Sequence, residues 1–196
     1  ITSNPYDGQR VPGTVGFALP DVELRVSDDD GSPVPAGVTG VVEIRSPGLF
    51  AGYWRMPDKT ASEHRAGGWF ITGDVGSVDA EGRLTLEGRS SDMIISGGYN
   101  VYPKEVEMVL DDVPGVLETG VIGVPHPDFG EAVVAVVVRD DSVDVSDVAL
   151  AASLDGVLAR FKHPKTYIAA DELPRNAMSK VQKAALRRVH ADLFTS

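Results

Sequence analysis

Alternating apolar and polar side chains predict antiparallel strands in the first part of the chain. Residues 22–26 (Val-Glu-Leu-Arg-Val) and 83–87 (Arg-Leu-Thr-Leu-Glu) have the period of two that is typical of half-buried strands, and residues 41–44 predict another. Residues 79–82, Asp-Ala-Glu-Gly, predict the turn of a hairpin. A short polar helix is expected at residues 57–65. This part of the chain therefore predicts a mostly antiparallel sheet.

After Gly88 the pattern changes to helices interspersed with strands. Helical spacing of apolar residues occurs at 103–113, 147–160 and 181–193, and strands are expected at 116–124, 132–138 and 166–169. The run at 132–138, Ala-Val-Val-Ala-Val-Val-Val, is apolar on both faces, which predicts a central strand in a covered sheet. The helix at 147–160 is expected to bury one apolar face, made of Val148, Leu150, Ala151, Leu154, Val157 and Leu158. The helix at 181–193 is expected to bury Val181, Ala185, Val189 and Leu193.

The two styles predict an α+β protein made of two domains. The first, residues 1–88, is rich in antiparallel strands, and the second, residues 89–196, is a small α+β domain with helices packed on its sheet. The boundary is placed near Gly88-Arg89 because the predicted secondary structure changes there from antiparallel strands to mixed helices and strands.

Composition and charge exclude several classes of function. The 196 residues include 18 Lys plus Arg and 29 Asp plus Glu, and this net charge of −11 argues against nucleic acid as a partner. The absence of Cys excludes disulfides, thiolate metal sites and a Cys nucleophile, and it fits a cytoplasmic location. No apolar run approaches the ~18 residues that a membrane span needs. The four His are far apart in sequence, so no zinc site is expected.

Three local clusters carry candidate chemistry. In residues 68–74, Gly-Trp-Phe-Ile-Thr-Gly-Asp, a tight turn after an aromatic strand would present Asp74, whose carboxylate can accept the two hydroxyls of a ribose diol. In residues 88–100, Arg89 is followed by Ser90 and Ser91, small residues that can absorb a hinge rotation. Gly97 and Gly98 in the same segment allow a ligand to approach the backbone.

The third cluster is a loop, residues 174–180, that delivers Lys180 just before a helix. A flexible ammonium is a suitable point charge for a phosphate or a developing oxyanion. Taken singly, each cluster is more typical of an ordinary feature: a turn aspartate, a strand that ends in a glycine turn, or a solvated lysine. Residue types and spacing alone leave the function open.

Together, and in this order, the clusters closely resemble the motifs of adenylate-forming enzymes, a family of acyl-CoA synthetases, peptide-synthetase adenylation domains and luciferases. The matching segments are residues 49–54, 73–74, 88–103, 161–165 and 174–180, so the resemblance covers essentially the whole chain. Within the family the chain most resembles malonyl-CoA synthetases, through residues 2–8, 13–17, 98–104 and 124–131.

The resemblance implies two half-reactions and a set of roles. A carboxylic acid attacks the α-phosphate of ATP to give an acyl-adenylate and pyrophosphate; the small domain then rotates and the thiol of CoA attacks the acyl-adenylate. Asp74, Arg89 and Lys180 would bind the nucleotide. Lys180 would also be the catalytic cation, bridging the acyl carboxylate and the α-phosphate, and residues 89–91 would form the hinge. The CoA set would be Gly97, Gly98, Phe129, Phe161, His163 and Lys165, although core packing is an equally good reading of the two phenylalanines.

Two residues depart from the family pattern. Ser91 stands where relatives usually have Asp or Lys at the hinge, which puts the usual charge contacts there in doubt. Ser179 precedes the catalytic lysine where many relatives have Gly. If this position needs a positive φ, the serine costs roughly 1 kcal/mol and the lysine loop is posed differently.

The resemblance also predicts that this chain is a C-terminal portion of an enzyme. It begins with Ile1 in what resembles the middle of a loop, and the phosphate loop, the acidic Mg²⁺ ligand and most of the acyl pocket would lie upstream, in a missing N-terminal part. The isolated chain is therefore expected to be inactive and to hold no metal ligand. Two alternatives stay open: a non-catalytic fragment that binds nucleotide or CoA, and an adenylation domain that serves a carrier protein.

Overall fold

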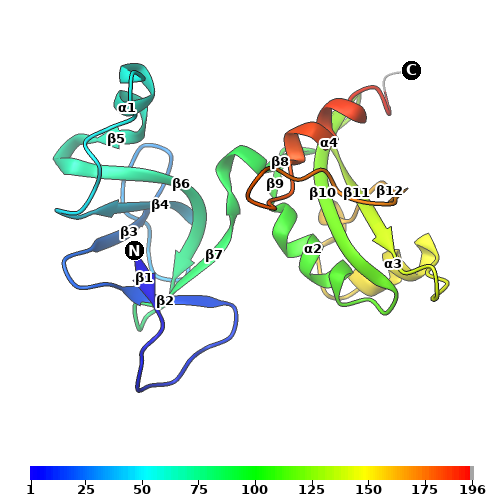
Figure 1. Cartoon of the computed structure of the whole chain (residues 1–196), viewed down its shortest axis with the longest axis horizontal. Coiled ribbons are helices and arrows are strands. Elements are labelled where there is room, and N and C mark those ends of the chain that lie inside the picture. The colour runs from blue at the N-terminus through cyan, green and yellow to red at the C-terminus, as the bar shows by residue number, and fades with distance from the viewer. Residues whose placement is uncertain (195–196) are drawn as a thin grey trace. The chain divides into compact units, whose positions relative to one another are not determined.

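The computed structural model describes residues 1–194 and divides the chain into two compact units, Ile1–Ser91 and Asp92–Ser196 (Figure 1). Both units combine a largely antiparallel sheet with a few short helices, so the α+β class expected from the sequence is confirmed. The function of the second unit as a separately moving domain stays a prediction.

The first unit is built on a seven-stranded antiparallel sheet. Its strands are β1 (Thr2–Ser3), β2 (Thr14–Ala18), β3 (Glu23–Ser27), β4 (Gly40–Arg45), β5 (His64–Arg65), β6 (Trp69–Val78) and β7 (Leu84–Arg89). They lie in the order β1-β2-β7-β6-β4-β3, and β5 pairs with β6. The helix α1 (Pro57–Glu63) and a 3₁₀ turn (Ala66–Gly68) precede β6. The predicted helix at 57–65 is two residues too long, because His64 and Arg65 pair with Phe70 and Trp69 as β5.

The predicted hairpin joins β6 to β7. Asp79 closes the turn, because its Oδ1 accepts the backbone N–H groups of Arg83 at 2.7 Å and Glu81 at 3.0 Å. The hydrogen bond from the backbone of Arg83 is the main cause of a lowered pKa at Asp79. The turn therefore fixes the register in which β7 returns along β6.

A buried carboxylate lies in the middle of this sheet. Glu43 on β4 is fully buried, and its two oxygens contact two guanidinium groups and one hydroxyl. Arg25 lies 2.7 Å away, Arg65 lies 2.6 Å away, and the hydroxyl of Ser27 donates at 2.8 Å. Arg25 also lies over the ring of Trp69, with 4.2 Å from its Cζ to the ring centroid. This network ties β3, β4, β5 and β6 together.

The second unit has a five-stranded sheet. Its strands are β8 (Ile94–Ser96), β9 (Tyr99–Val101), β10 (Val116–His126), β11 (Gly130–Arg139) and β12 (Thr166–Ala170). The order is β10-β11-β8-β9, and β12 pairs with β11 in parallel. The helices are α2 (Pro103–Asp111), α3 (Asp147–Leu154) and α4 (Lys183–Val189), with a 3₁₀ turn at Arg160–Lys162.

The prediction of a central strand that is covered on both faces is confirmed for β11. Val133, Ala135 and Val137 pack in one apolar cluster with residues of α2 and α3, whereas Ala132, Val134, Val136 and Val138 pack in a second cluster with Leu173 and Leu186. Helices α2 and α3 thus cover one face of β11, and α4 covers the other. Both faces of β11 are therefore removed from water.

The two last helices are shorter than predicted, and their predicted faces are partly wrong. The helix expected at 147–160 ends at Leu154, because Asp155 is extended and Gly156 has a φ of +77°. Leu150 and Leu154 are buried as predicted, but Val148 is 78% exposed and Val157 is 62% exposed.

In α4 the buried residue is Leu186, and Val189 is 77% exposed instead of facing the sheet. The reason lies on β10: Gly120 has no side chain, and a Cβ there would lie 2.9 Å from Cδ1 of Leu186. Leu186 therefore packs into the space that this glycine leaves, and this contact sets the rotation of the helix.

Candidate functional site

The structure brings Asp74 and Arg89 together in the first unit. The two residues are paired across β6 and β7, and Nε of Arg89 lies 3.0 Å from Oδ1 of Asp74. Nη1 of Arg89 donates to the carbonyl of Thr72 at 2.8 Å. The side chains of Asp74 and Arg89 are 29% and 54% exposed. The pair thus presents a carboxylate in a fixed orientation at the surface.

Asp74 lies within β6, so the expectation of a tight turn before it is wrong. The backbone is nevertheless irregular here, since Gly73 has a φ of +75° and the pairing of β6 with β7 shifts between Val75 and Gly76. The hydroxyl of Thr72 donates to the carbonyl of Val42 at 2.9 Å and accepts the N–H of Asp74 at 3.1 Å. This irregularity, rather than a turn, directs the side chain of Asp74.

The expected hinge residues follow directly at the end of β7. Ser90 and Ser91 lie in a 3₁₀ turn (Ser90–Asp92), and both are exposed. The hydroxyl of Ser90 donates to the carbonyl of Gly73 at 3.2 Å, beside the Asp74–Arg89 pair. The division into compact units falls between Ser91 and Asp92.

Lys180 lies in the second unit, at the end of an exposed loop that follows the buried Leu173. Its ammonium forms no ion pair or hydrogen bond with any residue in the range 1–194. The loop leads into α4 after Gln182, as the sequence predicted. Ser179 has a φ of +59°, so the serine does occupy a left-handed position that favours glycine.

Four residues of the expected CoA set meet at one end of the second sheet. Gly97 and Gly98, with φ values of +59° and +81°, form the turn between β8 and β9. The N–H of Gly97 donates to the carbonyl of Phe129 at 2.9 Å. The ammonium of Lys165 lies 4.7 Å from the centroid of the Phe129 ring. A glycine turn, an aromatic face and a cation are thus neighbours.

Phe161 and His163 lie along a hollow of about 430 Å³ in the same unit. The hollow is lined by Ala151, Arg160, Phe161, His163, Pro164, Lys165 and Tyr167. Phe161 stacks on Tyr99 with 4.7 Å between ring centroids, and Nε2 of His163 lies 3.0 Å from the carbonyl oxygen of Leu158. The buried hydroxyl of Tyr167 has no hydrogen-bond partner among the described residues, and burial is the main cause that raises its pKa to about 12. The hollow therefore combines cationic side chains with an unpartnered hydroxyl.

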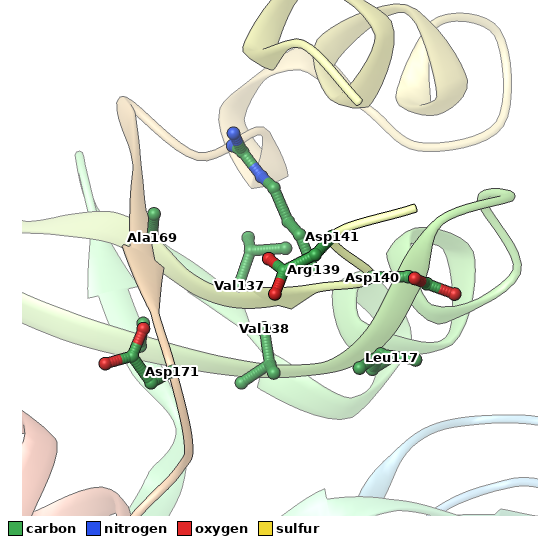
Figure 2. Close-up of a pocket in the computed structure, with 9 residues that line it drawn as sticks. Leu117, Val137, Val138, Arg139, Asp140, Asp141, Ala169 and Asp171 are labelled. Atoms are coloured by element: carbon green, nitrogen blue, oxygen red, sulfur yellow. The ribbon is translucent and has the colours of Figure 1, made fainter. Parts of the chain in front are cut away.

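A larger hollow, of about 680 Å³, lies where β11 and β12 end (Figure 2). Figure 2 shows the carboxylates of Asp140, Asp141 and Asp171 around it. Arg139 also lines it, but its guanidinium forms an ion pair with Asp147 on α3. None of the residues expected to act on nucleotide or CoA lines this hollow.

Sequence reasoning missed three kinds of contributor. Arg160 precedes the expected CoA residues, and the run Arg-Phe-Lys-His-Pro-Lys at 160–165 is a charge signal that could have found it. Asn176 organises the lysine loop, and asparagine is a typical turn residue. Thr72 gave no such signal, because its contact with Val42 depends on the register between β6 and β4.

Within residues 1–194 no group of three or more His, Asp or Glu residues is placed to hold a metal ion. No helix in the same range has the length and apolar character that crossing a bilayer requires.

Comparison with known proteins matches most of the chain to one family. Residues 1–54 match the AMP-binding enzyme model, and residues 105–180 match the model of the AMP-binding enzyme C-terminal domain. An indoleacetate–CoA ligase from Aromatoleum aromaticum is 41% identical over 95% of this chain, and a sulfoacetate–CoA ligase from Cupriavidus necator is 40% identical over 94%. The matched region is 36% of each relative, so the chain spans little more than a third of their length.

A solved structure shows the same likeness in three dimensions. ATP-bound MatB from Rhodopseudomonas palustris is 54% identical, with a TM-score of 0.93 over 98% of this chain and 39% of that one. With two family models and this structural match in agreement, the chain belongs to the adenylate-forming superfamily of AMP-binding enzymes.

Proposed function

We propose that this chain is the portion of an ATP-dependent acid–CoA ligase that binds the nucleotide and supplies a catalytic cation. In the first half-reaction a carboxylate oxygen attacks the α-phosphorus of ATP, forming an acyl-adenylate and releasing pyrophosphate. In the second the thiol of CoA attacks the acyl carbon, forming a thioester and releasing AMP. The observation that carries the proposal is the exposed ammonium of Lys180, which no described residue neutralises and which a closed loop presents to solvent.

Asp74 and Arg89 are proposed to bind the nucleotide. Arg89 binds Oδ1 of Asp74 and thereby fixes the plane of the carboxylate. Oδ2 has no protein partner among the described residues, so it is available as an acceptor. Ribose hydroxyls donate hydrogen bonds, and an ionised carboxylate is their strongest acceptor among side chains. The guanidinium of Arg89, more than half exposed, supplies a positive charge beside the nucleotide.

Lys180 is proposed as the catalytic cation of adenylation. Negative charge shifts onto the oxygens around the α-phosphorus as the carboxylate attacks, and a placed ammonium stabilises it. Loss of one such contact costs about 3–4 kcal/mol of transition-state stabilisation, or about 10²–10³-fold in rate. Attack by the CoA thiol needs no such cation at this position, because rotation of the small domain takes Lys180 away. The two half-reactions are therefore expected to depend on Lys180 very differently.

The second sheet is proposed to bind CoA. Gly97 and Gly98 leave the backbone open for the pantetheine chain, and the rings of Phe129 and Phe161 offer surfaces for adenine. His163 and Lys165 are the proposed partners of the 3′-phosphate. The hollow beside them adds Arg160, which strengthens the positive charge available to a phosphate.

Across the described residues, 1–194, no group of three or more His, Asp or Glu residues is placed to hold a metal ion. We propose that a preceding part of the enzyme supplies the acidic metal ligand, the phosphate loop and the acyl pocket. The isolated chain would then bind nucleotide or CoA weakly and would not turn over.

The proposed acid is malonate or a similar small dicarboxylate. The likeness to MatB, a malonyl-CoA synthetase, supports it. The sulfoacetate–CoA ligase is a relative whose substrate also carries a second anionic group. Other relatives are ligases for acids as different as indoleacetate and long-chain fatty acids. The identity of the acid is therefore the most specific part of the proposal.

The experiment joins this chain to the preceding part of MatB in place of the matching residues; ATP-bound chimeras of MatB have been solved. Pyrophosphate release reports adenylation with malonate, and thioester formation from preformed malonyl-adenylate reports the second half-reaction. We expect both activities in the chimera, neither in the isolated chain, and loss of adenylation alone in Lys180→Ala. Equal damage to both half-reactions would refute the role of Lys180. Adenylation without CoA-dependent turnover would favour a domain that serves a carrier protein, and turnover by the isolated chain would overturn the proposed division of labour.

A further inference from the structure

The loop that presents Lys180 is closed on itself by Asn176. Oδ1 of Asn176 accepts the N–H groups of Met178 at 2.9 Å and Lys180 at 3.0 Å. The backbone of Asn176 adds two more bonds: its N–H donates to the carbonyl of Lys180 at 2.9 Å, and its carbonyl accepts the N–H of Ser179 at 2.9 Å. Lys180 thus has both of its backbone polar groups bound by one residue, and its position follows from that residue.

Ser179 makes this closed loop strained. Its φ of +59° is a left-handed conformation that a residue with a Cβ adopts only at a cost, because Cβ approaches the following carbonyl oxygen. Such a residue stays in place only where its surroundings hold it. Besides Asn176, the restraint on Ser179 is Arg175, whose Nη1 donates to the carbonyl of Ser179 at 2.7 Å.

Arg175 is itself anchored to the sheet. Its Nη2 forms an ion pair with Glu118 on β10, so one guanidinium joins the sheet to the strained residue. At the far end of the loop, Lys183 begins α4 and pairs with the buried Glu107 of α2 at 2.6 Å. Both ends of the loop are therefore tied to the body of the second unit, and only the stretch between them projects.

We propose that Arg175 is a positioning residue for Lys180. By holding the carbonyl of Ser179, it keeps the left-handed turn that aims the next residue out of the domain. This inference rests on the proposed function of Lys180. Catalytic groups gain from being placed before the substrate arrives, and a displacement of about 1 Å can cost about 10²-fold in rate. Without Arg175 the strained turn relaxes, and the backbone no longer holds the ammonium of Lys180 in a fixed position.

The test uses Arg175→Ala and Arg175→Lys in the MatB chimera, each with a readout of both half-reactions. The lysine variant keeps the ion pair with Glu118 but has no second donor that reaches the carbonyl of Ser179. Arg188→Ala is the matched control, because Arg188 is an exposed arginine of the same unit outside the loop. We expect both Arg175 variants to lower kcat for adenylation about 10–100-fold, with the KM for ATP and the thioester step within about twofold of the unchanged chimera. Arg188→Ala should change neither half-reaction.

Rescue separates positioning from general stability. Ser179→Gly removes the strain, so it should restore most of the adenylation that Arg175→Ala loses when the two changes are combined. In the 196-residue chain itself, hydrogen exchange of the Lys180 amide should accelerate in Arg175→Ala, and Ser179→Gly should reverse this. Unchanged adenylation in Arg175→Ala, an equal loss in both half-reactions, or no rescue would each overturn the inference. If Lys180→Ala leaves adenylation intact, the proposed function itself fails; if only the Arg175 variants are silent, this inference alone fails.

Discussion

The carboxylate of Glu43 offers the sharpest test of how the first unit is held together. It is fully buried, whereas its partners Arg25 and Arg65 keep 22% and 24% of their side chains exposed. Glu43→Gln keeps the shape and one acceptor oxygen, but it removes the charge and turns an NH₂ group toward a guanidinium. The change therefore breaks a buried ion network without opening a cavity.

The size of the loss follows from the exposure of the partners. Removing one member of a buried ion pair costs about 3–5 kcal/mol, mostly because the remaining charge has lost its counterion. Arg25 and Arg65 both reach water in part, so some hydration returns and the lower end of about 3 kcal/mol is expected. With a urea m-value of about 1–2 kcal/mol/M, the midpoint should fall by about 1.5–3 M.

Tryptophan fluorescence measures this loss of stability in the first unit alone. The only two tryptophans, Trp54 and Trp69, both lie in the first unit, so their emission follows its unfolding separately from that of the second. Far-UV circular dichroism of the same samples follows both units. The transition of the second unit should keep its midpoint in Glu43→Gln.

Glu23→Gln is the matched control for the same sheet. Glu23 pairs with Arg45 at 2.5 Å, but this pair is largely exposed to solvent. Water and salt screen such pairs, so the fluorescence midpoint should not move measurably. A loss below about 1 kcal/mol in Glu43→Gln, or one no larger than that of the control, would show that burial of the carboxylate cancels its attraction to the two arginines.

Further predictions concern both units. Tyr167→Phe removes a buried hydroxyl without a described partner, so urea unfolding at pH 7 should show no loss of stability. Folding raises the pKa of Tyr167 to about 12 from 10.0; stability should thus fall as pH rises from about 10 toward 12, and fall less steeply in the variant. Leu186→Ala should cost about 2–5 kcal/mol in thermal or urea unfolding, whereas Val189→Ala, on the exposed face of the same helix, should be silent. Gly73→Ala should destabilise the first unit by about 1 kcal/mol or more, because φ is +75° and the new Cβ would lie 3.3 Å from Nη1 of Arg89; a fluorescence midpoint equal to wild type would contradict this.

The fold was predictable where local pattern and burial agree. The run at 132–138 is apolar at every position, and only a strand covered on both faces accommodates it, as β11 shows. The rotation of α4 was not predictable in this way. Val189 and Leu186 are both apolar, and the choice between them depends on Gly120 of β10, which is distant in sequence and leaves space for only one of them.

The candidate site was likewise predictable only in part. Short motifs indicated Asp74, Arg89 and Lys180 individually, and the structure shows that the first two form one ion pair. The contacts that orient them were hidden, since they depend on register and on backbone conformation. Thr72 meets Val42 across β6 and β4, and Arg175 holds Ser179 only because that serine is left-handed.

The hairpin between β6 and β7 links a surface loop to the ion pair of Asp74 and Arg89. Arg89 stands opposite Asp74 because the connection at residues 79–83 has its present length. Inserting or deleting one residue there, for instance at the exposed Ala80, would slide β7 by one position and turn the guanidinium to the opposite side of the sheet. Surface connections usually tolerate such changes in length. In the connection at residues 79–83, a single-residue insertion or deletion would separate Asp74 from Arg89 without changing either residue.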